Sequence, residues 1–284
     1  MKANLTLLTQ QRIVSASFLS LFSSQLPAAT VDTELLLLVD VSGSVSSSEY
    51  NLMMQGYANA FRSPSLVDSV ISGFHGSVAV SLAFWSGPEQ QVVGVDWMQV
   101  SDSSSSNAFA AAIDATTRPF GGTTAIGSAL SYGSTLFGTE VGGSDNGFQS
   151  LVQVIDISGD GEDNSTPPDT GNRAENVRNA RDQALASGVD MINGLPIGNA
   201  GGDLNGYYTN NVLAGAAGET AAFIQPTATF GDVESALTLK LNRELEAAGQ
   251  ESIQIASVPE PSTATLIVLA TTACLQRKRP SPTP

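Results

Sequence analysis

The chain has 284 residues, 42% of them hydrophobic, and carries 27 acidic against 12 basic residues for a formal net charge of −15. This length holds one sizeable α/β domain with terminal segments. An acidic body repels nucleic acid and anionic lipid, so we expect no nucleic-acid partner and no membrane contact by the folded part. The only cysteine, Cys274, excludes an internal disulfide. The only histidine, His75, stands in a Gly-Phe-His-Gly turn, where we expect a plain loop residue.

The N-terminal segment, residues 1–29, has the order of a secretory signal peptide. Lys2 and Arg12 precede an uncharged stretch over 13–26, and Pro27-Ala28-Ala29 then supplies small residues for cleavage. The alternative is an N-terminal core helix, which the clean start of the body at Glu34 disfavours. We therefore expect an exported protein whose domain occupies residues 30–250.

A buried strand is predicted over Leu35–Val39, and it ends in Asp40-x-Ser42-x-Ser44. A continuous apolar run bounded by Gly and Ser fits a strand that is buried on both faces, as in a parallel sheet. Ser46-Ser47-Ser48-Glu49 is typical of a capping box. Because apolar residues follow it at spacings of three and four, a helix is expected to begin there.

The turn after this strand carries candidate metal ligands. In an open α/β sheet, ligands bind beyond the carboxyl ends of the strands. Asp40, Ser42 and Ser44 offer hard oxygen atoms, which suit Mg²⁺ or a similar cation rather than zinc. The alternative is a Ser-rich turn whose hydroxyls only cap a helix and whose aspartate accepts backbone N–H bonds.

The rest of the body alternates between strands and helices. Ser77–Trp85 and Gln91–Val95 are close enough in sequence to form an antiparallel hairpin at the sheet edge. The other expected elements are a loop over 101–106, a helix over 108–115, a helix from the Gly121-Gly122-Thr123-Thr124 turn to Leu136, a flexible connection over 138–147, strands over 151–157, 190–196 and 221–225, a helix over 174–186, a long loop over 197–218, and a closing helix marked by Val233, Leu237, Leu241 and Leu245.

Two loops are expected at the same end of the sheet as Asp40. The first, over 160–172, follows Asp156-x-Ser158-x-Asp160-Gly161, which superficially matches the opening of an EF-hand. That interpretation fails because Pro167 stands where a glutamate is required and Asp156 lies within a strand. The second loop, over 197–218, carries Tyr207 and Tyr208, which either shape a partner surface or pack under the loop.

Together these motifs resemble von Willebrand factor A-type domains. The Asp40 turn is similar to the first part of that family's metal-ion-dependent adhesion site (MIDAS), Gly121–Leu130 to its threonine turn, and Leu151–Gly161 to its fourth strand. The resemblance implies an open, doubly wound, mostly parallel α/β sheet with one antiparallel edge strand and helices on both faces. It also implies a site for Mg²⁺, with Mn²⁺ or Ca²⁺ as alternatives. The implied ligands are Asp40, Ser42, Ser44, Thr124 and Asp160, with Thr123 as the alternative threonine.

The resemblance covers about residues 33–247 and extends to a bacterial subgroup known as a domain of unknown function. It implies that the two serines bind the metal directly, that Thr124 and Asp160 bind directly or through water, and that Asp40 acts mostly through water. One departure is Gly159, where many members have threonine. Glycine loosens this turn and can make Asp160 a water-mediated ligand.

The C-terminal region changes character at Ser257. Val258-Pro259-Glu260-Pro261 precedes an uncharged run over 264–275 and then Arg277-Lys278-Arg279, an order that resembles the PEP-CTERM sorting tail of bacterial exported proteins. The resemblance implies a linker and sorting motif over 251–263, a short apolar tail with a basic end over 264–284, and cleavage by an exosortase-type membrane protease. The apolar run is short for a bilayer core, and a permanent anchor is the alternative.

The function implied by the resemblance is that of an exported binding module and not an enzyme. It captures an acidic group on an unidentified protein or polymer, in the cell envelope or outside the cell. The alternatives are a structural envelope or matrix protein with a vestigial site and, less favoured, a metal-assisted hydrolase that uses Asp40 and Asp160. Serine or cysteine catalysis is disfavoured, because the sequence has no Gly-x-Ser-x-Gly turn and no Cys-His pairing.

Overall fold

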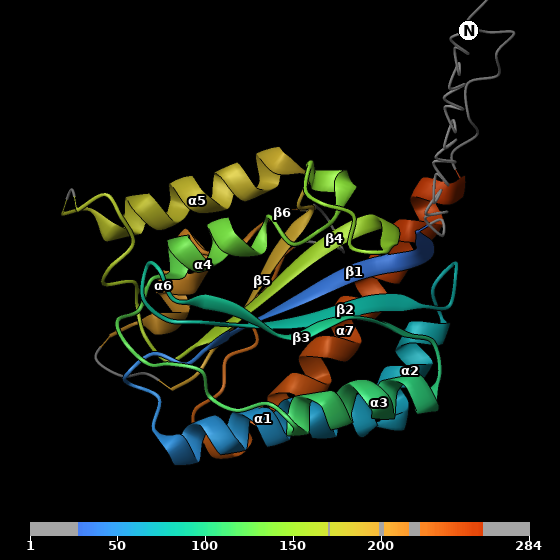
Figure 1. Cartoon of the computed structure of the whole chain (residues 1–284), viewed down its shortest axis with the longest axis horizontal. Coiled ribbons are helices and arrows are strands. Elements are labelled where there is room, and N and C mark those ends of the chain that lie inside the picture. Colours follow the sequence, from blue (N-terminus) through green and yellow to red (C-terminus); the bar gives the residue numbers. More distant parts are fainter. Residues whose placement is uncertain (1–27, 170, 199–201, 216–221, 258–284) are drawn as a thin grey trace, which may run out of the picture.

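A twisted six-stranded sheet lies between two layers of helices in the computed structural model, which describes residues 28–169, 171–198, 202–215 and 222–257 (Figure 1). The strand order is β3-β2-β1-β4-β5-β6. β1 (Ala29–Asp40) and β4 (Phe148–Gly159) form the centre and run parallel, with Leu37 opposite Asp156. The predicted mostly parallel, doubly wound fold is therefore confirmed.

The central strands are apolar on both faces because each face meets its own hydrophobic core. Leu35, Leu37 and Val39 of β1 belong to one core, whereas Leu36 and Leu38 belong to the other. All five side chains are fully buried. The uninterrupted apolar run read from the sequence thus reflects two opposite cores and not one amphipathic face.

Each edge of the sheet carries one antiparallel pair. The hairpin prediction is confirmed by β2 (Val78–Trp85) and β3 (Gln91–Val100), and β5 (Met191–Pro196) pairs antiparallel with the short β6 (Ala214–Gly215). The strand expected over 221–225 is wrong. Within the described residues that segment makes only one isolated bridge, from Ile224 to Gly194 of β5, and a second bridge joins Thr227 to Ile197 just beyond β5.

The helices divide between the two faces of the sheet. Figure 1 shows one layer below the sheet and the other above it. The lower layer holds α1 (Ser47–Arg62), α2 (Pro64–Ile71), α3 (Ser103–Asp114) and α7 (Val233–Ser257). The upper layer holds α4 (Ile126–Gly133), α5 (Arg173–Ser187) and α6 (Leu204–Asn211), and the 3₁₀ turns η1 (Thr139–Val141) and η3 (Phe230–Asp232) complete the chain.

Local capping explains where several helices begin. The capping box predicted at Ser46 and Glu49 is present in full at the start of α1. The Ser-rich tract 101–106 is not simply a loop, because Asp102 accepts the backbone N–H of Ser105 and makes Ser103 the first residue of α3.

Two short helices were not expected. α2 begins at Pro64, which is well suited to a first helical position. α6 lies within the segment expected to be a long loop, and Asp203 caps it by accepting the N–H of Gly206 at 2.9 Å. α7 continues to Ser257, so residues 251–257 are helical where a linker was expected.

The terminal segments proposed for export, 1–27 and 258–284, lie outside the described residues. In the described part of the chain, no helix combines the length and apolar character needed to cross a bilayer.

Candidate metal centre

The turn after β1 is held by its own aspartate. Asp40 is fully buried, and its Oδ1 accepts the backbone N–H of Ser42 at 2.7 Å. The second oxygen, Oδ2, is buried and has no hydrogen-bond partner among the described residues. The Oγ atoms of Ser42 and Ser44 lie 3.1 Å apart. The turn therefore collects four oxygen atoms, of which the buried Oδ2 is unsatisfied.

The end of β4 brings the second carboxylate to this turn. The Ser44 hydroxyl donates to Asp160 Oδ1 at 2.6 Å, across a sequence separation of 116 residues. This contact follows from the parallel pairing of β1 with β4, because the carboxyl ends of parallel neighbours meet at one edge of the sheet. Asp40, Ser42, Ser44 and Asp160 are thus brought together.

Of the two candidate threonines, Thr124 is buried and lies near Gly161, the residue after Asp160. It is 5% exposed, and a methyl group placed on Gly161 would lie 3.9 Å from its Oγ1. Its backbone N–H donates to Asn164 Oδ1 at 2.9 Å, and the N–H of Asn164 donates to the Thr124 carbonyl at 2.8 Å. Thr123 is not among the buried residues, and its carbonyl accepts the Ser86 hydroxyl. Burial and position therefore favour Thr124 over Thr123.

The loop after Asp160 fixes the threonine turn from outside. Asp163 and Thr166 are buried, and the Thr166 hydroxyl accepts the N–H groups of Gly127 and Ser128 at 3.0 and 3.3 Å. These residues cap α4, which has no side-chain cap of its own at Ala125. We did not expect this role for the acidic loop, and the sequence signal for it is the Asp-x-x-Thr spacing.

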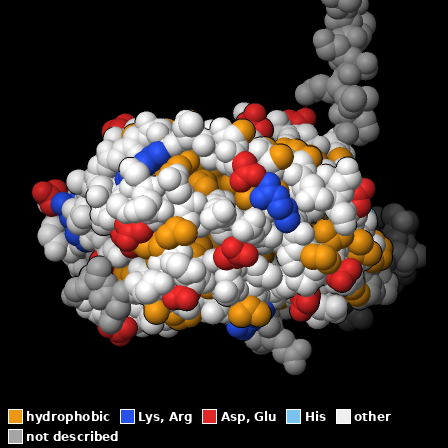
Figure 2. All heavy atoms as spheres, turned by 90° about the horizontal axis from the view of Figure 1, so that it is seen from below, with side chains coloured by type: hydrophobic (Ala, Val, Ile, Leu, Met, Phe, Trp, Pro, Cys, Tyr) orange, Lys and Arg blue, Asp and Glu red, His pale blue; other side chains and the backbone are white. Residues whose placement is uncertain are grey.

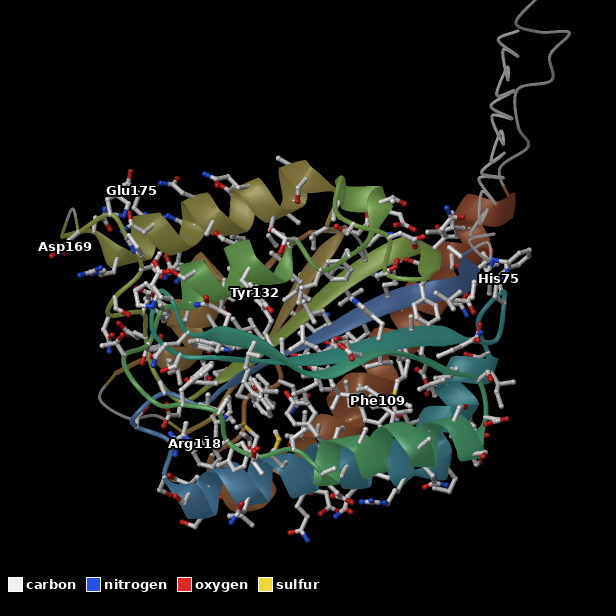
Figure 3. All side chains as sticks on the ribbon, in the orientation of Figure 1. His75, Phe109, Arg118, Tyr132, Asp169 and Glu175 are labelled. Atoms are coloured by element: carbon white, nitrogen blue, oxygen red, sulfur yellow. The ribbon has the colours of Figure 1, made fainter. Side chains whose placement is uncertain are left out.

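Arg118 is a second unforeseen part of the site. One of its guanidinium nitrogens donates to the carbonyls of Val41 and Ser42 at 2.8 and 2.7 Å, and its Nε donates to Phe120 at 3.2 Å. The guanidinium clamps the backbone of the Asp40 turn because its fork reaches several acceptors at once. Figure 3 shows Arg118 and His75 at opposite ends of the sheet, so the exposed His75 lies away from the site, in the loop where it was predicted.

Burial makes both carboxyls of the site hard to ionise. Desolvation raises the pKa of Asp40 to about 7, and the nearby Asp160 charge adds to this rise. Desolvation also raises the pKa of Asp160, while its hydrogen bond from Ser44 and the charge of Arg118 act in the opposite direction. Because a nearby positive charge favours the ionised form of a carboxyl, a bound cation would relieve this penalty.

Glycine is required at position 159 because a side chain would not fit there, and not because of its backbone conformation. A Cβ atom there would lie 2.7 Å from the Tyr208 hydroxyl, 2.9 Å from Asp40 Oδ2 and 3.3 Å from Trp85. Tyr208 is fully buried and its hydroxyl has no hydrogen-bond partner in the described structure. Of the two roles weighed for Tyr208, packing is therefore confirmed, and its ring and hydroxyl occupy the space that a larger residue 159 would need.

The residues present fit a hard divalent cation. The unsatisfied Oδ2 of Asp40 lies in a group whose donors are all oxygen atoms, the kind that Mg²⁺, Mn²⁺ and Ca²⁺ prefer. Within the described ranges no three or more His, Cys, Asp or Glu side chains gather as a metal cluster, so the ligand set depends on the hydroxyls of Ser42, Ser44 and Thr124.

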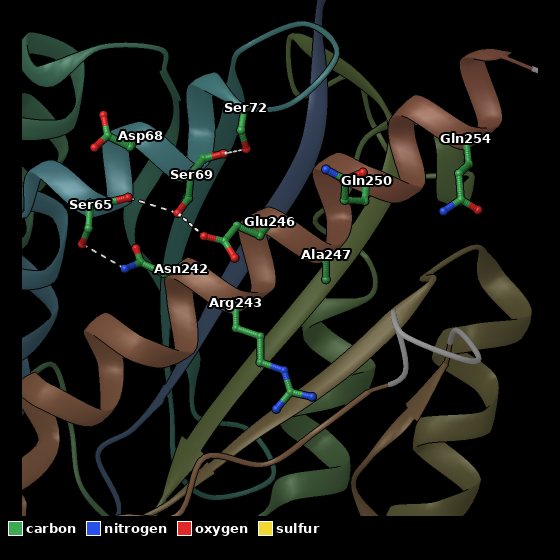
Figure 4. A pocket seen from close by; sticks show the side chains of 10 residues that line it. All are labelled: Ser65, Asp68, Ser69, Ser72, Asn242, Arg243, Glu246, Ala247, Gln250 and Gln254. Carbon is green, nitrogen blue, oxygen red and sulfur yellow. Dashed lines mark hydrogen bonds between the residues drawn. The ribbon is translucent and has the colours of Figure 1, made fainter.

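A separate groove of about 740 Å³ runs between α2 and α7 (Figure 4). Its side chains bond to one another: Asn242 donates to Ser65 Oγ at 2.9 Å, and Ser69 donates to Glu246 at 3.2 Å. None of the candidate metal ligands lines it. The groove is therefore distinct from the site at the ends of β1 and β4.

Comparison with models of protein families assigns the chain to a family. A family model described as a protein of unknown function (DUF1194) matches residues 30–249. The chain belongs to the DUF1194 family. A comparison with curated proteins found no significant match.

Several solved structures of other proteins have the same fold as this DUF1194 chain. It is similar to proximal thread matrix protein 1 from the mussel byssus, in a structure with a zinc-occupied MIDAS motif (TM-score 0.52, 17% identity, 77% of this chain and 49% of that chain). It is also similar to a von Willebrand factor type A protein from Catenulispora acidiphila (TM-score 0.50, 13% identity, 76% and 43%). A third similar structure is the pilus adhesin SpaC from Lactobacillus rhamnosus GG in an open conformation (TM-score 0.52, 16% identity, 80% and 31%).

The chain spans about half the length of the mussel protein and less of the other two. At these identities the likeness establishes the fold, which is of the von Willebrand A type, as the motifs predicted.

Proposed function

We propose that this DUF1194 protein is a metal-dependent binding module that captures an acidic group of a macromolecular partner. The observation that carries the proposal is the hydrogen-bonded line from Ser42 through Ser44 to Asp160, beside the unpartnered Oδ2 of Asp40. Thr124 completes the set from a third turn. The mussel protein supports this reading, because a protein of the same fold holds a divalent cation in its MIDAS motif.

The ligand chemistry suits capture of an acid better than hydrolysis. Asp40 and Asp160 only partly neutralise a doubly charged cation at close range, and the remaining donors are neutral hydroxyls. When bound, the cation supplies an electrophilic position for a carboxylate of the partner. The protein's own residues hold and orient that position: Arg118 fixes the Asp40 turn, and Asn164 fixes Thr124. We propose Mg²⁺ as the ion, with Mn²⁺ and Ca²⁺ as substitutes.

The partner is proposed to be an envelope or extracellular protein or polymer that carries carboxylates. This proposal rests on the signal-like residues 1–29 and the sorting-like tail, which together imply export and an exosortase-type protease. The charge balance supports a cation-bridged contact, because the chain carries 27 acidic against 12 basic residues. Acidic side chains are also spread over the lower helix layer, which Figure 2 shows from below. Such a surface repels an acidic partner unless a cation joins the two.

Calorimetric titration of the purified protein with Mg²⁺ and with Mn²⁺ tests the metal site. We expect the wild type to bind one ion and Asp160→Ala to bind none. Thr124→Ala should weaken binding by roughly tenfold or more, and the matched control Thr123→Ala should bind as the wild type does. If the wild type and Asp160→Ala give equal heats, the proposal that a metal binds at this site is wrong. The alternative that then remains is a structural protein with a vestigial site.

A pull-down from an envelope fraction tests the partner. We expect capture by the wild type in Mg²⁺, loss of capture on adding a chelator, and no capture by Thr124→Ala. Capture that is unchanged by the chelator would show that any partner is held elsewhere on the surface.

A further inference from the structure

Three ionisable side chains are buried together between α7 and the middle of the sheet. Lys240 and Asp156 are fully buried and Glu244 is 2% exposed. The Lys240 Nζ forms an ion pair with Asp156 Oδ1 at 2.6 Å and donates a hydrogen bond to Glu244. Both carboxyl oxygens of Asp156 and the Oε2 of Glu244 have no hydrogen-bond partner among the described residues. The amine therefore bridges two carboxyls that have few other partners.

The surroundings of this group are mostly apolar, with the buried side chains of Tyr57 and Asn193 as polar neighbours. Asp156 lies opposite Leu37 on β1, and Lys240 lies between the buried Leu237 and Leu241 on α7, with its Nζ 5.5 Å from the centre of the Phe223 ring. Fully ionised, the group would hold one net negative charge away from water, which is costly even for a well-formed ion pair.

The choice of lysine at this position is unusual for this chain. Lys240 is the only lysine in residues 28–257, where every other basic residue is arginine. An arginine is better suited to a purely structural bridge between two carboxylates, because its planar fork binds both and stays charged. What lysine offers instead is a primary amine, which becomes a nucleophile once it loses a proton.

We propose that Lys240 and Asp156 form an intramolecular isopeptide bond, with Glu244 as the proton carrier. The Nζ atom attacks Cγ of the protonated Asp156 carboxyl, so an N–C bond forms and a C–O bond breaks. Glu244 takes one proton from the nitrogen and returns one to the leaving hydroxyl, which departs as water. Nothing is oxidised or reduced, and Glu244 ends in the state in which it began.

The environment favours both the reaction and its product. Desolvation raises the pKa of Asp156, which favours its neutral form, and raises the pKa of Glu244 to about 8, in the range suited to a group that takes up and returns a proton. The reacting groups are already in contact, which removes most of the entropic cost of bringing an amine and an acid together. The product replaces two buried charges with a neutral amide, so the desolvation cost of the ion pair disappears.

Peptide mapping of the purified, denatured full-length protein tests the proposal. Trypsin cuts after Arg173, Arg178 and Arg181, so it separates Asp156 from Lys240. We expect these two peptides to be recovered joined, one water lighter than their sum, with no cleavage after Lys240. Cleavage after Lys240 in all molecules, with a free Asp156 peptide, would overturn the proposal whatever the variants do.

Variants assign the roles. Glu244→Gln should form the link roughly 100-fold more slowly, and Lys240→Arg should not form it at all. Glu246→Gln is the matched control, because it makes the same change on the exposed side of the same helix and should leave the linked fraction unchanged. Equal linking rates in Glu244→Gln and Glu246→Gln would remove Glu244 from the mechanism.

Discussion

Asp156 lies on β4 and Asp160 directly follows that strand, and the two meet the cost of a buried carboxylate in different ways. Asp160 stands just beyond the strand end, where the Ser44 hydroxyl donates a hydrogen bond to it. Asp156 lies in the middle of β4, where an amine from α7 contacts it and water is excluded. The difference teaches that a carboxylate just beyond the strand end is placed for the exchangeable ion proposed above, whereas one in the middle of the strand needs a partner from within the protein.

The largest expected effect on stability comes from removing Lys240, the partner of Asp156 inside the protein. Lys240→Met removes both the buried amine and the link proposed for it and leaves the Asp156 and Glu244 carboxyls without this partner, so we expect it to lower the free energy of unfolding by about 3–5 kcal/mol or more. Urea unfolding in the presence of a chelator measures this. The control is Arg243→Met, which removes an exposed cation stacked 3.9 Å from the Phe223 ring and should cost far less. Equal losses for both variants would mean that the buried group contributes no special stability.

In contrast to Lys240→Met, a substitution of Asp40 at the end of β1 should raise the free energy of unfolding of the metal-free protein. Asp40→Asn keeps the acceptor for the Ser42 N–H but removes a buried charge, so it should abolish metal binding and stabilise the metal-free protein. An unfolded aspartate has a pKa of about 3.9, whereas folded Asp40 has a pKa of about 7. The wild type therefore loses stability as the pH rises through this window, and the loss is complete above the folded pKa.

Urea unfolding of the metal-free proteins measures that difference. At about pH 8 the asparagine variant should be more stable by up to about 3–4 kcal/mol, and near pH 4 the two proteins should be nearly equal. Equal stability at both pH values would show that the Asp40 carboxylate is not strained in the absence of a metal.

The smallest expected effect concerns the packing that separates the two regions. Gly159→Ala places a methyl group against the Tyr208 hydroxyl and Asp40 Oδ2, and we expect a loss of about 1–3 kcal/mol in thermal unfolding. Adding Tyr208→Phe removes the closest contact and should recover part of the loss. The control Gly161→Ala meets only Thr124 Oγ1, at 3.9 Å, and should be tolerated. If the double variant recovers none of the lost stability, the strain in Gly159→Ala does not come from the contact with the Tyr208 hydroxyl.

The sequence predicted the features that depend on local patterns and on strand direction. Apolar runs gave the central strands, the capping box placed the start of α1, and the rule that parallel strands end at one edge brought Asp40 and Asp160 together. Short helices were harder, because α2 and α6 have few residues with which to display a period. The serines before α3 resembled a loop until their cap at Asp102 was seen.

Apart from this meeting of strand ends, contacts between distant segments were not predictable from the sequence. Arg118 reaches the Asp40 turn across 76 and 77 positions, and Tyr208 fills the space beside Gly159 from a helix that was not expected. The buried group of Lys240, Asp156 and Glu244 did have one signal in the sequence. Lys240 and Glu244 stand four residues apart, directly beside the apolar stripe of α7, where a helix packed on a core would have hydrophobic residues.

The position of Lys240 also bears on how the protein withstands tension. The chain leaves the described body through α7, and Lys240 fastens that helix to the middle of β4, whose end carries Asp160. A pull on the chain beyond α7 and a pull from the partner proposed for the metal site would therefore enter the same strand. β4 lies between the parallel neighbours β1 and β5, so a force along it must shear both ladders at once and cannot unzip them one bond at a time.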